Sequence, residues 1–206
     1  MTAPPKGDDM PDLLPAARRF VDGLRELCRS NLDDRTRWER AAHLLREFLR
    51  DEELAERARN WPVSHDRTND RYTNLLFYED ADHGFVLNGL VKDQTGKTPV
   101  HDHGHAWVLY GLLEGAERVL RFERTDDGSV PGRAQLRPSV GVDLHAGEVD
   151  LVPPWSPHAE RALSGRTVAV IVRSAKPGTF HHCRYDVERG TVAEHPAPAQ
   201  VPYPLL

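Results

Sequence analysis

Cysteine is scarce in this sequence. The 206 residues include two cysteines, Cys28 and Cys183, and they are far apart, with no Cys-x-x-Cys pair. Two isolated cysteines provide neither a disulfide framework nor a thiolate zinc site. The fold is therefore expected to depend on an ordinary hydrophobic core, and the reducing cytoplasm is the expected location.

Long apolar runs and an excess of basic residues are also missing. No stretch approaches the roughly 18–20 apolar residues that a membrane helix needs, and the opening MTAPPKGDDM lacks the apolar core of a signal peptide. The 27 lysines and arginines are outnumbered by 32 aspartates and glutamates, for a formal net charge of −5. Proteins that bind phosphate backbones are usually basic. We therefore expect neither a membrane nor a nucleic-acid partner, and favour a small-molecule substrate.

The first 62 residues carry a helical pattern. Apolar residues recur every three or four positions over 11–30 and again over 38–58, which predicts amphipathic helices separated by a break at Asn31–Thr36. A helix with one apolar stripe needs a surface on which to bury it. We expect residues 1–62 to form a helical segment packed on the rest of the protein.

The pattern changes at about residue 63. Short runs rich in valine, leucine and aromatic residues alternate with turn-forming residues through residue 192, which is typical of a compact β domain. The expected strands are Asn74–Tyr78, Gly84–Val91, Val100–Leu113, Arg118–Glu123, Gln135–Arg137, Val149–Val152 and Thr167–Arg173. The tail, 193–206, contains four prolines. We expect it to wrap the surface in extended form.

Three histidines have the spacing of metal ligands. His101 and His103 stand two residues apart in an expected strand, so both imidazoles would project from one face. His158 follows an apolar strand and a proline-rich turn. Three neutral imidazoles leave the other positions of a metal ion open for substrate or O2. We predict that His101, His103 and His158 bind one ion.

These segments resemble the two motifs of the cupin superfamily, whose members fold as a small double-stranded β-helix barrel. The matching positions are Gly96, His101, His103 and Gly115 in the first motif and Gly147, Pro153 and His158 in the second. The glutamate of the first motif falls here on Trp107 or Val108. A three-histidine site without that glutamate resembles the thiol dioxygenases, the cysteine dioxygenases and their relatives, and the segment Tyr72–Leu76 is similar too. The resemblance implies a mainly β cupin barrel with an N-terminal helical layer.

The sequence also departs from that family. The family's Ser-x-His-x-Tyr relay is absent, because Ala169, Ile171 and Arg173 occupy those places. The family's carboxylate-binding arginine is displaced, which leaves Arg71 and Asn74 as candidates. A guanidinium can hold an anion through two parallel hydrogen bonds. We therefore predict an anionic substrate and name Arg173, Arg71 and Asn74 as substrate-binding residues.

Four residues beside the motifs are candidates for the chemistry: Arg173, His105, Tyr110 and Trp155. His105 shares the strand parity of the first two histidines, so it could be a further ligand, a hydrogen-bond donor or an inert surface residue. Tyr110 and Trp155 could line a pocket or belong to the core.

The predicted function follows from the resemblance. It implies a mononuclear Fe(II) oxygenase of the cysteine dioxygenase-like type, in which O2 oxidises a small anionic molecule, with a thiol as one candidate. Two alternatives stay open, a cupin that binds a metal or ligand without turnover and a non-oxidative isomerase or hydrolase. Imidazole suits several metals, so Zn, Mn and Ni are alternatives to Fe(II). The sequence leaves the oligomeric state open.

Overall fold

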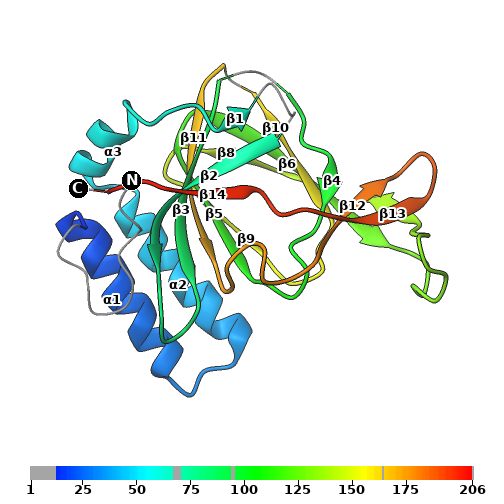
Figure 1. Cartoon of the computed structure of the whole chain (residues 1–206), viewed down its shortest axis with the longest axis horizontal. Helices are drawn as coiled ribbons and strands as arrows, with labels where there is room; N and C mark the ends of the chain where they lie inside the picture. Colours follow the sequence, from blue (N-terminus) through cyan, green and yellow to red (C-terminus); the bar gives the residue numbers. More distant parts are fainter. Residues whose placement is uncertain (1–12, 67–70, 94–95, 164, 206) are drawn as a thin grey trace.

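Strands make up most of the regular structure, and the helices are confined to the N-terminal end (Figure 1). The computed structural model describes residues 13–66, 71–93, 96–163 and 165–205. The helices are α1 (Pro15–Arg29), α2 (Asp34–Phe48) and α3 (Glu52–Ala58). The strands are β1 (His65–Asp66), β2 (Arg71–Glu79), β3 (Val86–Lys92), β4 (Val100–His101), β5 (Val108–Glu114), β6 (Ala116–Arg124), β7 (Leu136–Pro138), β8 (Val142–His145), β9 (Val149–Val152), β10 (His158–Ala162), β11 (Thr167–Arg173), β12 (His182–Asp186), β13 (Thr191–His195) and β14 (Ala199–Pro202). Within this described part, no helix is long and apolar enough to cross a membrane.

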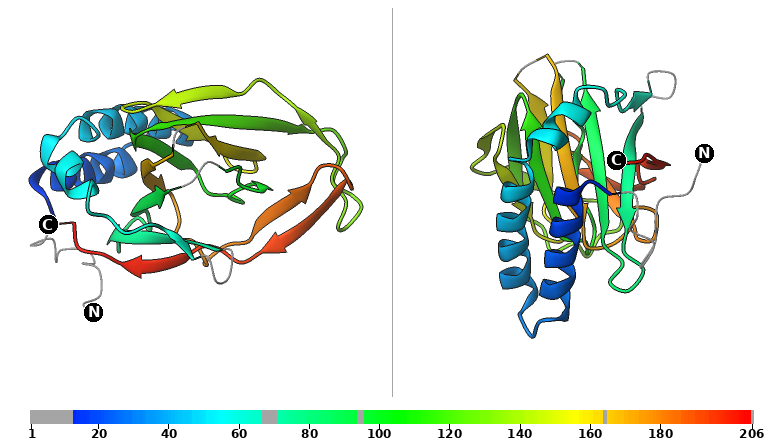
Figure 2. Two further views of the ribbon diagram at one scale, coloured as in Figure 1. Left: turned by 90° about the horizontal axis from the view of Figure 1, so that it is seen from above. Right: turned by 90° about the vertical axis from the view of Figure 1, so that its left-hand side faces the viewer.

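The strands belong to two seven-stranded sheets. The first has the order β1-β2-β3-β11-β5-β9 with β14 beside β2, and the second has the order β13-β12-β4-β10-β6-β7 with β8 beside β6. From β3 to β12 the chain passes back and forth between the sheets, and the strands form a flattened ring when seen from above (Figure 2). This winding is that of the cupin double-stranded β-helix, which confirms the predicted fold class.

The first sheet separates two apolar clusters. In its strand β11, Val168, Val170 and Val172 belong to the cluster shared with the helices, whereas Ala169 and Ile171 belong to a smaller cluster inside the barrel. Side chains of a strand alternate between its two faces, and every residue of β11 is buried. One face of β11 therefore supports the helical layer and the other forms a wall of the barrel interior.

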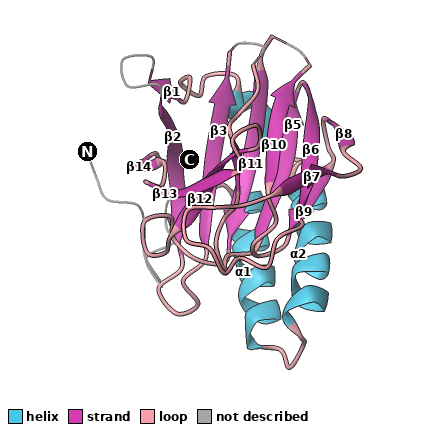
Figure 3. Ribbon diagram, turned by 90° about the vertical axis from the view of Figure 1, so that its right-hand side faces the viewer, coloured by secondary structure: helices cyan, strands magenta, loops and turns pink. Residues whose placement is uncertain are grey.

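Helices α1 and α2 lie against the outer face of this sheet, as the sequence predicts (Figure 3). Their aromatic residues Phe20 and Phe48 stack with ring centroids 5.5 Å apart. At Gly111 of β5, an added Cβ would lie 2.9 Å from the Leu49 side chain and 3.0 Å from that of Leu45. The glycine therefore lets α2 approach the sheet closely.

Two aspartates determine where the later helices begin. Asp33 accepts a hydrogen bond from the backbone N–H of Thr36 at 2.9 Å, so α2 starts inside the segment expected to be a break. Asp51 accepts from the N–H of Leu54 at 3.0 Å and starts α3 as a separate helix. A side-chain oxygen at this position satisfies a backbone donor that has no partner within the helix. The long second stripe is therefore two helices rather than one.

A buried ion pair joins α1 to the barrel. Arg25 Nε donates to Asp80 Oδ2 at 2.6 Å, and the Tyr78 hydroxyl donates to the same oxygen at 3.0 Å. Burial tends to raise the pKa of Asp80, but hydrogen bonds from Arg25 and from the His83 backbone outweigh it, so the net shift is downward. The carboxylate thus stays charged and couples the helical layer to the first sheet.

Several strands differ from those expected. The single strand predicted over Val100–Leu113 is two strands, β4 and β5, which lie in different sheets. The chain turns between them at Gly104, whose φ is +54°. Strands β1, β8, β10, β12, β13 and β14 were not among those expected from the sequence, since they are short and only partly apolar.

The C-terminal segment is more tightly integrated than an extended wrap. The expected boundary between residues 192 and 193 falls inside β13, which pairs with β12 in the second sheet. Strand β14 then pairs in parallel with β2 of the first sheet. The two ends of the described part of the chain meet, because Leu14 N donates to the Leu205 carbonyl at 2.8 Å. The tail therefore connects both sheets and the helical layer.

Candidate metal centre

The structure brings the three predicted histidine ligands together. His101 ends β4, His103 lies in the turn after it, and His158 begins β10. His101 and His158 face each other in the antiparallel pairing of β4 and β10. One ring nitrogen from each histidine lies within 4.8 Å of the others, and the ring centroids are 4.5–5.0 Å apart. This group could hold a single metal ion.

Backbone carbonyls select the ring nitrogen that is left for an ion. His101 Nδ1 contacts the Pro99 carbonyl at 3.0 Å and His158 Nδ1 contacts the Ser156 carbonyl at 2.8 Å. A carbonyl can only accept, so each Nδ1 carries the hydrogen and each Nε2 keeps its lone pair. His158 Nε2 is buried and has no hydrogen-bond partner among the described residues. An orphaned buried acceptor of this kind fits a metal ligand.

The environment also favours neutral imidazoles at two of the three positions. Burial lowers the pKa of His101 to about 4 and lowers that of His103 well below its ordinary value. Burial acts in the same direction on His158, but the adjacent Glu160 carboxylate outweighs it and the net pKa shift is upward. Ligation needs the neutral form, and His101 and His103 are already neutral near pH 7.

Asp102 fixes the turn that carries the first two ligands. Its side chain is fully buried and accepts hydrogen bonds from Gly104 N at 3.0 Å, Cys183 N at 3.0 Å and the Tyr185 hydroxyl at 2.6 Å. On the far side of the turn, Trp155 N donates to the Gly104 carbonyl at 2.7 Å. These contacts tie the turn to β12 and to the loop before His158, so all three ligands share one rigid support.

A cavity of about 120 Å³ adjoins the histidines, against the roughly 10–15 Å³ that one water molecule needs. Its inner walls include the apolar residues Leu90, Val108 and Ile171. Its mouth is lined by Pro177, Phe180 and the tail segment 196–198. The space suits a small organic molecule in largely dry surroundings.

Arg173 lines this cavity, on the face of β11 that its parity predicts. It is 5% exposed and donates to the neutral Asn88 side chain at 2.8 Å. Among the described residues, no carboxylate forms an ion pair with it. Burial accordingly lowers the pKa of Arg173 to about 10, so the guanidinium is still charged near pH 7. A buried charge without a counter-ion is costly, and a substrate anion would supply one.

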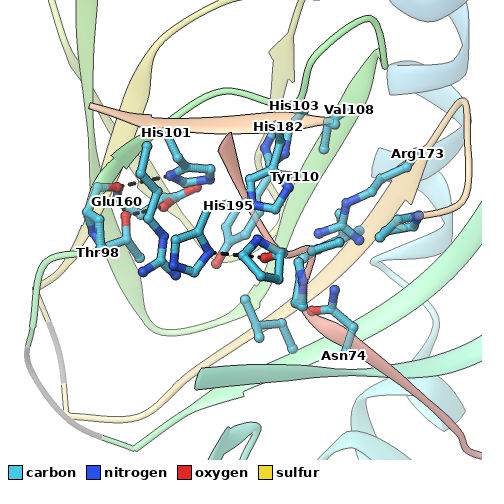
Figure 4. Close-up of a pocket in the computed structure, with 18 of the residues that line it drawn as sticks. Asn74, Thr98, His101, His103, Val108, Tyr110, Glu160, Arg173, His182 and His195 are labelled. Carbon is cyan, nitrogen blue, oxygen red and sulfur yellow. Dashed lines mark hydrogen bonds between the residues drawn. The ribbon is translucent and has the colours of Figure 1, made fainter. Parts of the chain in front are cut away.

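Asn74 offers a second donor to the same cavity. It is 2% exposed, and its Nδ2 has no hydrogen-bond partner in the described structure. Figure 4 shows Asn74 and Arg173 together on one side of the view, and Thr98 and Glu160 on the other. The tail orients this end, because Gln200 of β14 accepts a hydrogen bond from Asn88 at 2.8 Å.

The remaining predicted site residues are dispersed. Tyr110 lines the cavity, with its hydroxyl directed to Glu117 at 3.2 Å. His105 is exposed and its ring centroid lies 5.1 Å from that of Phe180, outside the cavity lining. Trp155 is 61% exposed and also lies outside. Arg71 begins β2, and its side chain is not among the described ones.

Backbone turns explain the positions of His105 and Trp155. Gly104 adopts φ +54° and Trp155 adopts φ +56°, so neither segment keeps the alternation of a strand. Strand parity was the reason for grouping His105 with the ligands, and this reason does not apply beyond His103. Of the alternatives left open by the sequence, the structure therefore favours a surface position for His105, and it places the candidate Trp155 neither in the cavity lining nor in the core.

Glu160 is a site residue that the sequence reasoning missed. It is 8% exposed, lines the cavity, and places Oε1 3.4 Å from His158 Nε2. Its other oxygen, Oε2, accepts from the Thr98 hydroxyl at 2.7 Å. Burial tends to raise the pKa of Glu160, but the neighbouring histidines and Lys92 hold it well below its ordinary value. The signal was present in the sequence, since residue 160 shares a strand face with residue 158.

No protein-family model and no curated protein matches the chain. Among solved structures, it is similar to a conserved protein with a double-stranded β-helix domain from Klebsiella pneumoniae (13% identity, TM-score 0.40, covering 60% of this chain and 91% of that one). It is also similar to a cupin-2 domain protein from Shewanella frigidimarina, with 16% identity and a TM-score of 0.36 over 50% of this chain and 79% of that one. A third similar structure is oxalate oxidase in complex with a substrate analogue, glycolate, with 19% identity and a TM-score of 0.36 over 45% of this chain and 42% of that one. The chain thus spans less than half the length of the oxalate oxidase, and about half of a Thevetia peruviana cysteine peptidase it also matches.

Proposed function

We propose that this protein is a mononuclear Fe(II)-dependent oxygenase of the cysteine dioxygenase-like type, which uses O2 to oxidise a small anionic thiol. One observation carries the proposal. Three histidines converge on one point, and two of them, His101 and His103, line a small cavity. The same cavity is lined by the charged Arg173 and by Asn74, whose amide nitrogen has no hydrogen-bond partner among the described residues.

Different residues of the site would bind the metal ion, bind the substrate and exclude water. His101, His103 and His158 would hold the ion, and iron(II) bound there would supply the O2 chemistry. Arg173 and Asn74 would hold a carboxylate of the substrate and so direct its other end to the histidines. The apolar walls would exclude water and strengthen these polar contacts. The reaction is RSH + O2 → RSO2H, in which the sulfur loses four electrons, O2 accepts them and no other reductant is required.

The absence of the relay residues supports a divergent member rather than a cysteine dioxygenase in the narrow sense. At the inner positions of β11 this chain has Ala169, Ile171 and Arg173. Two of these cannot transfer a proton, and the third is a fixed cation. The wall that carries the relay in the family it resembles would here bind the substrate's anionic group.

The test is O2 consumption by protein reconstituted anaerobically with iron(II). We expect uptake with thiols that carry a carboxylate, such as cysteine and 3-mercaptopropionate, and much slower uptake with cysteamine, which lacks the carboxylate. Propionate, without the thiol, should give none. Iron binding without uptake for any thiol would instead assign a binding cupin, and purification with zinc, manganese or nickel and no iron would favour a non-oxidative metal enzyme.

A further inference from the structure

A buried carboxylate stands beside the metal centre and takes no part in the function proposed so far. It belongs to Glu160, in the middle of β10. Its Oε2 is anchored by the Thr98 hydroxyl at 2.7 Å, and the Thr98 oxygen in turn accepts from Glu160 N at 2.9 Å. The anchor leaves Oε1 free on the side of His158.

The separation of Oε1 and His158 Nε2 is that of two ligands on one ion. The two atoms are 3.4 Å apart. Among the described residues, the group whose ligand atoms all lie within 4.8 Å of one another contains His101, His103 and His158 but not Glu160, so the carboxylate would have to turn toward the other two histidines to share their ion. Nitrogen and oxygen ligands of a first-row metal lie about 2.0–2.2 Å from it, so adjacent ligands are separated by roughly 3.0 Å at a right angle and about 3.4 Å at the tetrahedral angle. Among the described residues, His158 Nε2 has no hydrogen-bond partner of good geometry, and its contact with the Glu160 carboxylate outweighs burial and raises the pKa of His158.

The charge of Glu160 also has no directly paired lysine or arginine. It is 8% exposed, and among the described residues no lysine or arginine forms an ion pair with it, although the more distant Lys92 helps to lower its pKa. The one ion-pair contact recorded for it is with His158, which is charged only when protonated. A buried carboxylate requires a cation, and a divalent ion between the histidines would be that cation.

We infer that Glu160 is a fourth protein ligand, which makes the centre a three-histidine, one-carboxylate site. The inference rests on the metal site of the proposed function. The carboxylate would come from β10, two residues after the third histidine, whereas the first motif has Val108 or Trp107 at its glutamate position. It would lower the net charge of the occupied centre by one and leave fewer positions for substrate and O2.

The test compares wild type with Glu160→Gln after chelator treatment, by titrating each with Co(II) and recording the visible absorption of the bound ion. We expect the substitution to weaken Co(II) binding at least about ten-fold and to change the absorption spectrum, because the ligand set changes. Equal affinity with an unchanged spectrum would overturn the inference. Weaker binding with an unchanged spectrum would also overturn it, since Glu160 would then only position His158.

The choice of metal gives a second, independent readout. Carboxylate oxygen suits Mn(II), whereas imidazole suits Ni(II). Glu160→Gln should therefore weaken Mn(II) binding by a larger factor than Ni(II) binding, and equal factors would contradict ligation. Glu114→Gln is the matched control, because Glu114 lies on β5 in a half-exposed contact with Arg166. It should alter neither titration.

A structure of the wild-type protein loaded with Co(II) decides the matter even if the variant fails to fold. An Oε1 atom about 2.0–2.3 Å from the ion supports the inference, and one beyond hydrogen-bond distance overturns it. A wild-type protein that binds no Co(II) at all would instead refute the metal centre on which the proposed function depends. Failure of the inference and failure of the function are thus distinct results.

Discussion

The barrel interior contains two polar clusters that differ in how completely their groups are paired. At one, Glu117 is fully buried and accepts hydrogen bonds from Lys92 at 2.8 Å, Thr167 at 2.6 Å and Tyr110 at 3.2 Å. At the other, His158 Nε2 and Asn74 Nδ2 have no partner in the described structure. Both clusters occupy the same apolar interior, so desolvation alone does not distinguish them.

This difference distinguishes buried polar groups that stabilise the fold from buried polar groups that are available to bind a ligand. A satisfied network offsets the cost of its own burial and stabilises the fold, whereas an unsatisfied one costs free energy in the empty protein. That cost is recovered only when a ligand supplies the missing partners. We therefore assign the Glu117 cluster to stability and the histidine cluster, together with Arg173 and Asn74, to binding.

The largest expected effect is a loss of metal affinity in the histidine cluster, whose polar groups are not all paired. His158→Ala should lower iron(II) affinity by more than about 100-fold, because loss of a mere hydrogen-bond partner of a ligand already costs roughly 10–100-fold. The melting temperature should stay the same or rise, as an unsatisfied group is removed. Elemental analysis and calorimetry measure the two effects. His105→Ala, outside the cavity, should keep its metal, and the opposite pattern would refute the assignment of ligands.

The satisfied cluster should respond in the reverse manner. Glu117→Ala leaves Lys92 buried without its counter-ion and should lower the free energy of unfolding by about 3–5 kcal/mol. Arg173→Met removes a buried charge that forms no ion pair within the described structure, so the substitution should cost little stability or even stabilise the fold. Denaturant unfolding measures both variants. Similar losses for the two would remove the distinction between the clusters.

Arg173 can also be tested through binding. Arg173→Ala should weaken the binding of a carboxylate-bearing thiol by about 2–4 kcal/mol while the metal content stays constant. Arg173→Lys should rescue only part of this loss, because an ammonium lacks the planar fork of the guanidinium. Calorimetric titration of the metal-loaded protein measures the effect. Unchanged affinity would shift the anion site to Asn74 and Arg71.

A third paired cluster, outside the barrel, predicts a smaller effect of pH. The folded pKa of Asp80 lies below its unfolded value, since Arg25 donates to it. Its contribution to stability is therefore fully present above about pH 4, the ordinary value, and is lost as the pH falls through the folded pKa. The stability difference between wild type and Asp80→Asn should shrink from pH 5 to pH 3. A difference that stays constant would exclude this linkage.

Local sequence was sufficient for much of this architecture. The apolar stripes predicted the helical layer, because a helix exposes one face to its support. The apolar run Thr167–Arg173 predicted a strand, which the structure shows as β11, buried on both faces. The spacing of His101 and His103, with His158 after a stiff turn, predicted ligands that the structure does bring within 4.8 Å of one another.

Tertiary structure decided what depends on distant segments. Glu160 gains its importance from its contact with His158 and from Thr98, 62 positions away in the chain. The positions of His105 and Trp155 follow from backbone turns at Gly104 and at Trp155 itself. The alternation of side chains along a strand does not determine them. The short strands β12–β14 carry weak local patterns, and they form because the sheets offer edges with which their backbones can pair. Periodicity reports which face a residue occupies, but only the fold determines which other residues share that face.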